Sequence, residues 1–365
     1  MTQTLQQILD DHVSRGTAPG IIGVTGDPDG KVEIVTAGDL AADAIVRIQS
    51  MTKPVIAVAT LRLVQNGRLG LDDAVETWLP ELADRRVLRS PGASLDDVEP
   101  AVTPITVRHL LTNTSGYGVM TTPSPLQEAM IANRTESGPE PVSLGAQDWL
   151  EALAALPLAF QPGTGWRYHH SFGILGILLS RLVDGSLEEH LQRDLFGPLG
   201  MVDTGYSVSI EQAHRLPAAY RHEGDGLVEV EPAAAGFSVA PVPFDVSHSE
   251  LVTTAADYAV FARMLAAGGR HDGHVVLAPE LLAAMRTDQV PASAKAPDSF
   301  YPGFWDATGW GYGVAMQTEG EDAGRYGWSG GLGTDFSVDP DGSFRIVLAQ
   351  VEMGQEVLGL FADTR

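Results

Sequence analysis

The chain has 365 residues, a formal net charge of −24 and no cysteine. The length allows a large core, and the lack of cysteine excludes disulfides, thiolate metal sites and thiol catalysis. The acidic excess argues against nucleic acid and anionic membranes as partners, because both require clustered Lys and Arg. No segment is apolar over the length of a membrane span, and residues 1–10 do not resemble a signal peptide, so we expect a cytoplasmic protein.

The N-terminal part predicts two strands followed by a central helix. Residues 21–24 and 32–35 read as short strands around the turn sequence Asp-Pro-Asp-Gly at 27–30. The apolar run at 55–67 predicts a helix whose broad apolar surface is typical of a buried element. Residues 117–145 are rich in Pro, Ser, Thr and Gly and predict a long surface loop.

The rest of the chain predicts helices first and strands last. Helices are expected at 147–156, 172–183, 187–195, 254–267, 279–286 and 357–362, and strands at 311–317, 324–328, 334–338 and 344–351. Strands at both ends around a helical middle indicate one α+β domain, with an antiparallel sheet flanked by helices and built from both termini. We expect residues 1–75 and 245–365 to form the α/β part. Residues 76–244 are then an inserted, mostly helical part.

The first candidate active-site motif is Ser50-x-x-Lys53, at the start of the first long predicted helix. Residues three apart share a helix face, so a hydroxyl lies beside an amine where free N–H groups favour negative charge. The chain has only three lysines among 23 basic residues, yet it keeps one here. A desolvated Lys can lose its proton, whereas Arg cannot. Alone, the motif also fits a helix N-cap serine and a surface lysine.

Three stretches together resemble a known superfamily. They are Ser50–Lys53, the segment Gln161–His170, and the segment Gly327–Gly331. Their order is similar to that of the three boxes of the serine β-lactamase and penicillin-binding-protein superfamily. The likeness is greatest for the class C β-lactamase-like branch, which includes carboxylesterases, D-aminopeptidases and acyltransferases. Residues 106–116 and 196–201 also resemble that branch, so the likeness covers nearly the whole chain.

The resemblance implies a role for each matching residue. Ser50 would attack an acyl carbon and form an acyl-enzyme, and Lys53 would accept or relay its proton. Tyr168 would share that proton and pass it to the leaving group or to water. The backbone N–H groups of Ser50 and Gly331 would hold the oxyanion. Glycine at 330 and 331 would let a substrate approach the backbone closely.

Two positions depart from the pattern of the branch. The second box ends in His170 where Asn is usual, so His170 either hydrogen-bonds the acyl group in the pocket or is structural. The third box is Trp328-Ser329-Gly330, expected to bind substrate, and it begins with Trp where Lys or His is usual. Trp328 is expected to form a pocket wall, with core packing as the alternative. Because Trp328 cannot hold a carboxylate, the prediction shifts from β-lactams toward neutral esters or amides.

The remaining site predictions are less specific. Tyr117, Trp305 and Trp310 are candidates for the pocket rim, with plain core packing as the alternative. The ten His show no HExxH spacing, so we expect no metal and no cofactor. Residues 247–251 replace a glycine-rich loop of the branch, and the sequence offers no chemical reason for that change.

These observations predict a serine hydrolase that forms an acyl-enzyme on Ser50 and acts as a carboxylesterase on small to medium acyl esters. The alternatives are an acyltransferase of secondary metabolism using the same acyl-enzyme, and a D-aminopeptidase or amidase. The intact Ser50, Lys53 and Tyr168 argue against a non-enzymatic binding protein. The expected partner is a small-molecule ester or amide, and the sequence leaves the oligomeric state open.

Overall fold

The largest sheet of the described residues has seven strands, and every neighbouring pair of strands in it is antiparallel. The computed structural model describes residues 3–136, 142–224, 226–239 and 250–365. The sheet has the order β11 (Thr308–Trp310), β12 (Ala315–Gln317), β13 (Tyr326–Gly330), β14 (Thr334–Val338), β15 (Phe344–Leu348), β1 (Gly20–Gly26) and β2 (Val32–Gly38). The prediction of an α+β fold with a sheet built from both termini is therefore confirmed.

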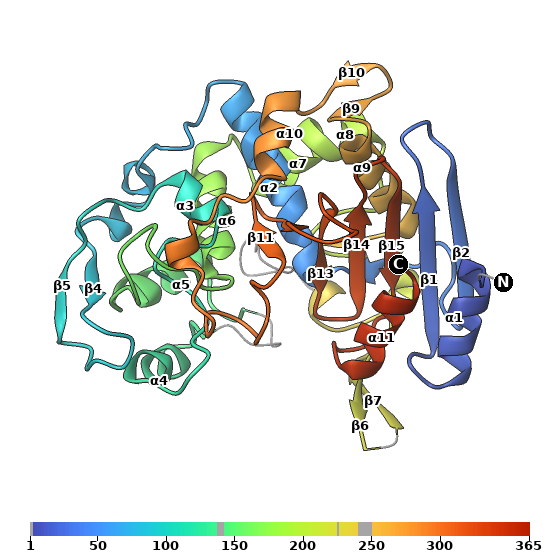
Figure 1. Cartoon of the computed structure of the whole chain (residues 1–365), viewed down its shortest axis with the longest axis horizontal. Coiled ribbons are helices and arrows are strands. Elements are labelled where there is room, and N and C mark those ends of the chain that lie inside the picture. Colours follow the sequence, from blue (N-terminus) through green and yellow to red (C-terminus); the bar gives the residue numbers. More distant parts are fainter. Residues whose placement is uncertain (1–2, 137–141, 225, 240–249) are drawn as a thin grey trace.

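Helices cover both faces of this sheet (Figure 1). On β15, Ile346 faces the core that contains α2 (Thr52–Gln65) and α9 (Ala255–Ala266). Its neighbour Val347 faces the opposite core, with residues of α1 (Leu5–Ser14) and α11 (Gln355–Asp363). Successive residues of a strand point to opposite faces, so the alternation of apolar residues along β15 builds two cores at once.

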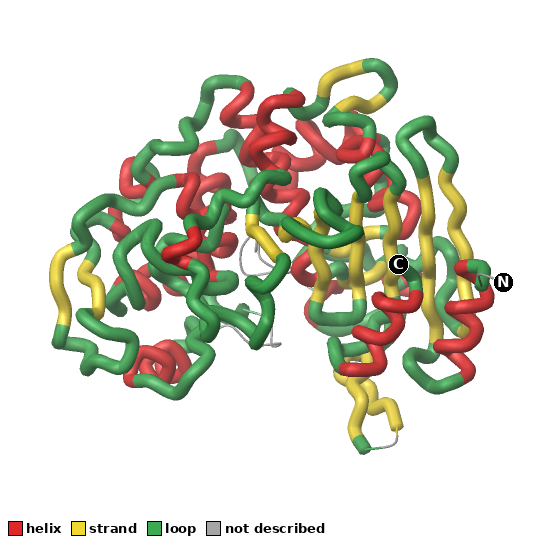
Figure 2. The backbone as a smooth tube through the Cα atoms, viewed as in Figure 1, coloured by secondary structure: helices red, strands yellow, loops and turns green. Residues whose placement is uncertain are grey.

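A helical region lies beside the sheet, and α2 runs between the two (Figures 1 and 2). It contains α3 (Val107–Leu111), α4 (Pro125–Ala132), α5 (Ala146–Ala154), α6 (His170–Leu182), α7 (Leu187–Leu191) and the short hairpin of β4 (Arg86–Leu88) and β5 (Val98–Pro100). Shorter elements elsewhere in the described chain include β3 (Val46–Arg47), α8 (Gly197–Leu199), β8 (Val252–Thr253), β9 (Arg270–His271), β10 (His274–Val275) and α10 (Pro279–Met285).

Two details differ from the expectations. The prediction of a long loop over 117–145 is wrong at 125–132, where α4 lies, and residues 137–141 lie outside the described part of the chain. Ser124 caps the start of α4, Pro125 suits its first position, and the buried Leu126 and Met130 anchor it. A hairpin of β6 (Ala219–Glu223) and β7 (Gly226–Glu231) belongs to residues 76–244 but is joined to the sheet side through the Tyr220 N–H and the Gln350 carbonyl. The proposed division at residues 75 and 245 stays a prediction.

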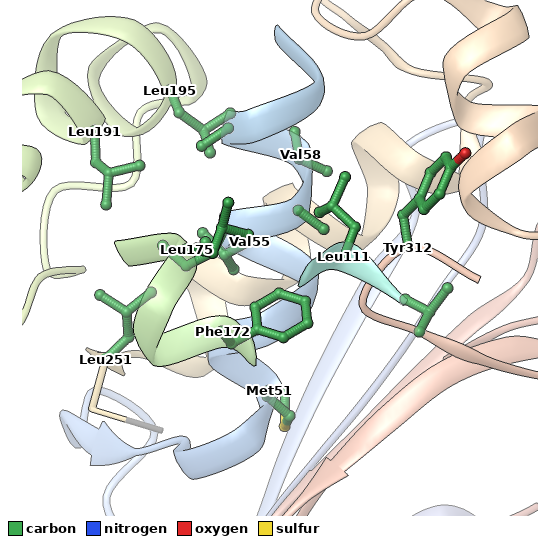
Figure 3. Packing of buried hydrophobic residues seen from close by; sticks show 14 of the residues in the cluster. Met51, Val55, Val58, Leu111, Phe172, Leu175, Leu191, Leu195, Leu251 and Tyr312 are labelled. Atoms are coloured by element: carbon green, nitrogen blue, oxygen red, sulfur yellow. The ribbon is translucent and has the colours of Figure 1, made fainter. Parts of the chain in front are cut away.

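The helix α2 is buried over almost its whole length, as its sequence indicates. Figure 3 shows Val55 and Val58 packed among Phe172 and Leu175 of α6 and Leu111 of α3. Each such side chain contributes about 1.5–3 kcal/mol when it is fully buried. The first turn of α2, which follows Ser50, is therefore attached to an element that the core holds rigidly.

Candidate active site

Ser50 lies in a short 3-10 turn, Gln49–Met51, directly before α2. Lys53 Nζ donates a hydrogen bond of 2.9 Å to Ser50 Oγ. The predicted pairing of hydroxyl and amine on one helix face is thus present. Gln49 has a φ of 49°, in the left-handed region that residues other than glycine seldom adopt. Such local strain is frequent at functional sites and is tolerated only where surrounding contacts enforce it.

The side chain of Lys53 is completely buried. Desolvation lowers the pKa of its ammonium well below 10.5, and the carboxylate of Glu250 partly opposes that shift. Lys53 Nζ also lies 4.5 Å from the centre of the Tyr168 ring. A lysine in this environment holds a neutral amine at a lower pH than an exposed lysine does. It can therefore accept the proton that Ser50 loses when it attacks.

Tyr168 is hydrogen-bonded to Ser50 and also contacts Trp328 of β13. Trp328 Nε1 donates a hydrogen bond of 2.6 Å to Tyr168 Oη. Burial raises the pKa of Tyr168, and its hydrogen bonds with Ser50 and Trp328 partly oppose the shift. The phenol is therefore protonated at neutral pH. An indole N–H can only donate, so Tyr168 Oη accepts from Trp328 and keeps its own proton for Ser50 or a leaving group.

The backbone around Ser50 is fixed from two distant elements. Thr334 Oγ1 of β14 donates to the Ile48 carbonyl at 3.0 Å, and Tyr258 Oη of α9 donates to the Met51 carbonyl at 3.0 Å. These two hydrogen bonds hold the peptides on either side of Ser50. Sequence reasoning missed both residues, because neither lies near the motif in the chain and a single hydroxyl carries no recognisable spacing.

The end of β13 contacts the Ser50 segment directly. A Cβ atom on Gly330 would lie 2.2 Å from the Ile48 carbonyl oxygen and 2.3 Å from Thr334 Oγ1, so only glycine fits there. Gly331 follows and is exposed, and its carbonyl accepts a hydrogen bond of 2.8 Å from the Met353 N–H. Glycine is therefore required at 330, where the backbone of the Ser50 segment approaches closely, whereas a Cβ atom on Gly331 would meet no atom closer than Gln49 Oε1, at 4.0 Å.

Ser329 points to the opposite face of β13 from Trp328. In the sheet register Trp328 lies beside Phe336, whereas Ser329 lies beside Asp335. Ser329 Oγ donates to Asp335 Oδ1 at 2.6 Å, and Asp335 also pairs with Arg345. The hydroxyl that was expected to bind substrate is thus engaged by a buried carboxylate.

Two other predicted pocket residues are packed into the helical region. His170 is fully buried, its Nε2 lies 2.7 Å from the Thr135 carbonyl, and its ring stacks on Trp149. Burial lowers the pKa of His170 to about 4, so the ring is neutral and Nε2–H donates to that carbonyl. Tyr117 is 4% exposed and belongs to the main core. These contacts match the structural alternative for His170 and the core alternative for Tyr117.

Tyr168 packs into an aromatic cluster and contacts the rings of Trp166, Phe300, Trp310 and Trp328. Its members are Trp166, Tyr168, Phe300, Phe304, Trp305, Trp310 and Trp328. Trp310 and Trp328 meet edge to face with ring centres 4.7 Å apart, and Trp166 lies 5.4 Å from Trp310. Trp310 is fully buried, which matches the core alternative rather than a place on the pocket rim. The core cluster to which it belongs also contains Tyr168. The cluster is formed by three segments that are far apart in the sequence, 166–168, 300–310 and 328. No local spacing of residues in the sequence predicts it.

Neither metal ligation nor membrane insertion is indicated within residues 3–136, 142–224, 226–239 and 250–365. Those residues hold no group of three or more His, Asp or Glu side chains that could bind a metal ion. None of their helices is long and apolar enough to cross a bilayer.

Two known proteins are similar to this chain in sequence. Protein Rv1367c of Mycobacterium tuberculosis is 34% identical to the chain over 309 residues, which are 82% of this chain and 75% of that protein. Esterase EstB of Burkholderia gladioli is 32% identical over 321 residues, which are 81% and 74% of the two chains.

Two solved structures show the same fold. EstCE1, a hydrolase with promiscuous acyltransferase activity, has a TM-score of 0.82 and 22% identity, and the match covers 99% of this chain and 97% of that one. Unliganded simvastatin synthase of Aspergillus terreus has a TM-score of 0.77 and 18% identity, covering 99% and 95%. The model of the beta-lactamase family matches residues 3–355. The chain therefore belongs to the beta-lactamase family.

Proposed function

We propose that the protein is a serine hydrolase that forms an acyl-enzyme on Ser50 and acts as a carboxylesterase on small to medium acyl esters. The observation that carries the proposal is the 2.9 Å hydrogen bond between Ser50 Oγ and the completely buried Lys53 Nζ. A nucleophile beside a base of lowered pKa is the arrangement that covalent catalysis needs. The likeness to esterase EstB supports the ester as substrate class.

Acylation uses the three side chains in sequence. The neutral amine of Lys53 takes the Ser50 proton while Oγ attacks the carbonyl carbon. The N–H groups of Ser50 and Gly331 stabilise the oxyanion. As the intermediate collapses, Tyr168 donates its proton to the leaving alkoxide, and the Lys53 ammonium then reprotonates Tyr168. Water then attacks the acyl-enzyme and gives its proton to the neutral Lys53 amine, and Tyr168 donates its proton to Ser50 Oγ as it leaves and is reprotonated by the Lys53 ammonium.

The third box explains the preference for neutral esters. Trp328 supplies no positive charge, and its single N–H donor is already used by Tyr168. We therefore assign Trp328 to the wall of the site, and Ser329 and Gly330 to the strand along which the substrate lies. His170 and Tyr117 support the helical side of the site from the core. The cytoplasmic location predicted from the sequence stays a prediction.

An acyltransferase is the second candidate. The aromatic cluster beside Tyr168 offers an apolar surface on the leaving-group side, where an acceptor alcohol would enter. Acyltransferase calJ of Penicillium decumbens is 36% identical over 167 residues, 45% of this chain. Both candidates share the acyl-enzyme. A D-aminopeptidase or amidase is less favoured, because no cation stands in the third box.

The test is the intact mass of the protein after incubation with a fluorophosphonate and with p-nitrophenyl butyrate. With the fluorophosphonate we expect a stoichiometric adduct on the wild type and on Ser94→Ala, an exposed serine control, and none on Ser50→Ala, and with p-nitrophenyl butyrate we expect turnover by the first two proteins. Turnover by Ser50→Ala should fall by about 10⁴-fold or more. A folded wild type that forms no adduct would refute the proposal. Added alcohols and amines then separate hydrolase from transferase by the product formed besides free acid.

A further inference from the structure

A cavity of about 350 Å³ opens on one side of the predicted oxyanion pair. Its described lining includes Gln49, which precedes the nucleophile, and Gly331. Val230, Pro232, Phe237 and Leu332 supply an apolar surface. Ligand pockets usually measure about 300–1,000 Å³, so this one suits a small to medium group.

The position of the cavity identifies which half of the substrate enters it. An ester carbon attacked by Ser50 carries the oxyanion, the leaving group and the acyl chain. The leaving group must lie near Tyr168 to receive its proton. The cavity borders Gln49, the residue before Ser50, and Gly331, whereas Ser50, Lys53, Tyr168 and Trp328 are not among its described lining residues. A group that leaves the acyl carbon on the side away from Tyr168 would therefore enter it.

We propose that this cavity is the acyl subsite, and that it selects neutral acyl chains of medium length and rejects chains that end in a carboxylate. The inference rests on the proposed acyl-enzyme at Ser50 and names the substrate class that the same site takes.

The outer wall of the cavity is attached firmly to the sheet. The Tyr220 N–H of β6 donates to the Gln350 carbonyl at 3.0 Å, and the Glu352 N–H donates to the Tyr220 carbonyl at 2.7 Å. The buried Arg47 pairs with Glu231 of β7 at 2.8 Å. A wall fixed on both strands of the hairpin gives the cavity a defined depth, which is what selection by chain length requires.

The charges around the cavity explain the rejection of carboxylates. Arg47 is committed to Glu231, and Arg221 serves both Glu223, at 2.5 Å, and Glu352, at 3.9 Å. Among the described lining residues, acidic groups thus outnumber the cations available to a ligand. A terminal carboxylate on the acyl chain would meet the half-buried Glu352 and would compete with Glu223 and Glu352 for Arg221, the one cation in the described lining, so desolvating it would be unfavourable.

The first experiment measures kcat/KM for p-nitrophenyl acetate, butyrate, hexanoate and octanoate. For the wild type we expect an increase with chain length of up to about fourfold per buried methylene, reaching a plateau when the cavity is filled. Val230→Trp should fill the cavity and lower the value for hexanoate by about tenfold or more, while acetate changes by less than about threefold. Val228→Trp is the matched control, because Val228 lies on the same strand, is 43% exposed and does not line the cavity.

The second experiment compares p-nitrophenyl pentanoate with the mono-p-nitrophenyl ester of glutaric acid, which adds a terminal carboxylate. The wild type should prefer pentanoate by about a hundredfold, and Glu352→Gln should reduce that preference by about five- to tenfold. Equal turnover of the two esters by the wild type would overturn the charge argument. Equal losses on acetate and hexanoate in Val230→Trp, or no loss on either, would overturn the subsite.

The outcomes distinguish this inference from the function on which it rests. If the wild type hydrolyses acetate but shows no dependence on chain length, only the subsite assignment fails. If the wild type hydrolyses no ester and forms no adduct at Ser50, the proposed function fails and the subsite fails with it.

Discussion

The first turn of α2 and the end of β13 meet at Ser50, yet they are built in opposite ways. The α2 turn buries an ionisable group, Lys53, and is held by a helix that packs on all sides. The end of β13 carries Gly330 and Gly331, and its neighbour Trp328 belongs to an aromatic cluster. In the proposed mechanism, one side supplies the proton-transfer groups from a rigid core, and the other supplies the backbone and the apolar surface along which the substrate lies.

Replacing the buried base should have the largest effect on the α2 side. Lys53→Met should lower kcat by about 10³-fold, because general base catalysis is lost. Lys31→Met, at an exposed position, should leave kcat unchanged.

The same change should stabilise the fold. The pKa of Lys53 is lowered in the folded state, so the buried ammonium destabilises folding at every pH below that folded pKa. The penalty shrinks as pH rises toward 10.5 and is absent above it. Calorimetry should therefore find a higher Tm for Lys53→Met at neutral pH, with a gap that closes toward pH 10.5. A lower Tm at neutral pH would contradict this account of the lysine.

Removing the proton donor should have the next largest effect. Tyr168→Phe should lower kcat by about 10²–10³-fold, since the leaving alkoxide would lose its acid. Tyr326→Phe is the matched control, because Tyr326 is also buried and its Oη has no hydrogen-bond partner among the described residues. The two variants are compared by steady-state kinetics on one ester. Similar losses in both would show that Tyr168 acts through packing alone.

The contact between the two segments can be broken without changing any catalytic side chain. Gly330→Ala should lower kcat/KM by about 10–100-fold and stability by about 1–3 kcal/mol, because its Cβ would displace the Ile48 carbonyl. Gly331→Ala should cost less in both measurements, since its Cβ would approach no atom closer than 4.0 Å, at Gln49 Oε1. Chemical denaturation and ester kinetics on both variants test the difference. Equal effects would mean that the close approach at Gly330 is not what positions Ser50.

The smallest expected effect concerns the indole donor. Trp328→Phe keeps the aromatic surface but removes the hydrogen bond to Tyr168, which should lower kcat by about five- to tenfold, the value of one hydrogen bond. Trp310→Phe is the control, because Trp310 Nε1 has no hydrogen-bond partner among the described residues. Its kcat should change by less than about threefold. If Trp310→Phe is the more damaging change, packing of the cluster outweighs the donor.

The same contrast explains what could be predicted from the sequence. Ser50, Lys53 and the helix that follows were predictable, because three-residue spacing and apolar periodicity act within one turn of a helix. Thr334 and Tyr258, which hold the Ser50 peptides, were not, because their positions follow only from the tertiary fold.

The predictions that differ from the structure, or that were left open, also have physical explanations. The helix α4 was read as a loop because its cap residues, Ser124 and Pro125, are also turn formers. His170 was open to two roles, since the sequence does not show that the Thr135 carbonyl lies within reach of its ring. Gly330 was expected to admit a substrate, whereas its first constraint comes from the Ile48 carbonyl.

The pairing of β1 with β15 has a consequence for how the chain reaches this structure. Ile22 lies beside Leu348, so the middle of the sheet closes only between residues from the two ends of the sequence. During synthesis, β1 and β2 can pair only with each other until β15 has been made. A hairpin of two strands is at best marginally stable by itself. Contacts of such long sequence separation slow folding. The catalytic turn, attached to this sheet through Thr334 and Ile48, would therefore be assembled late, when nearly the whole chain is available.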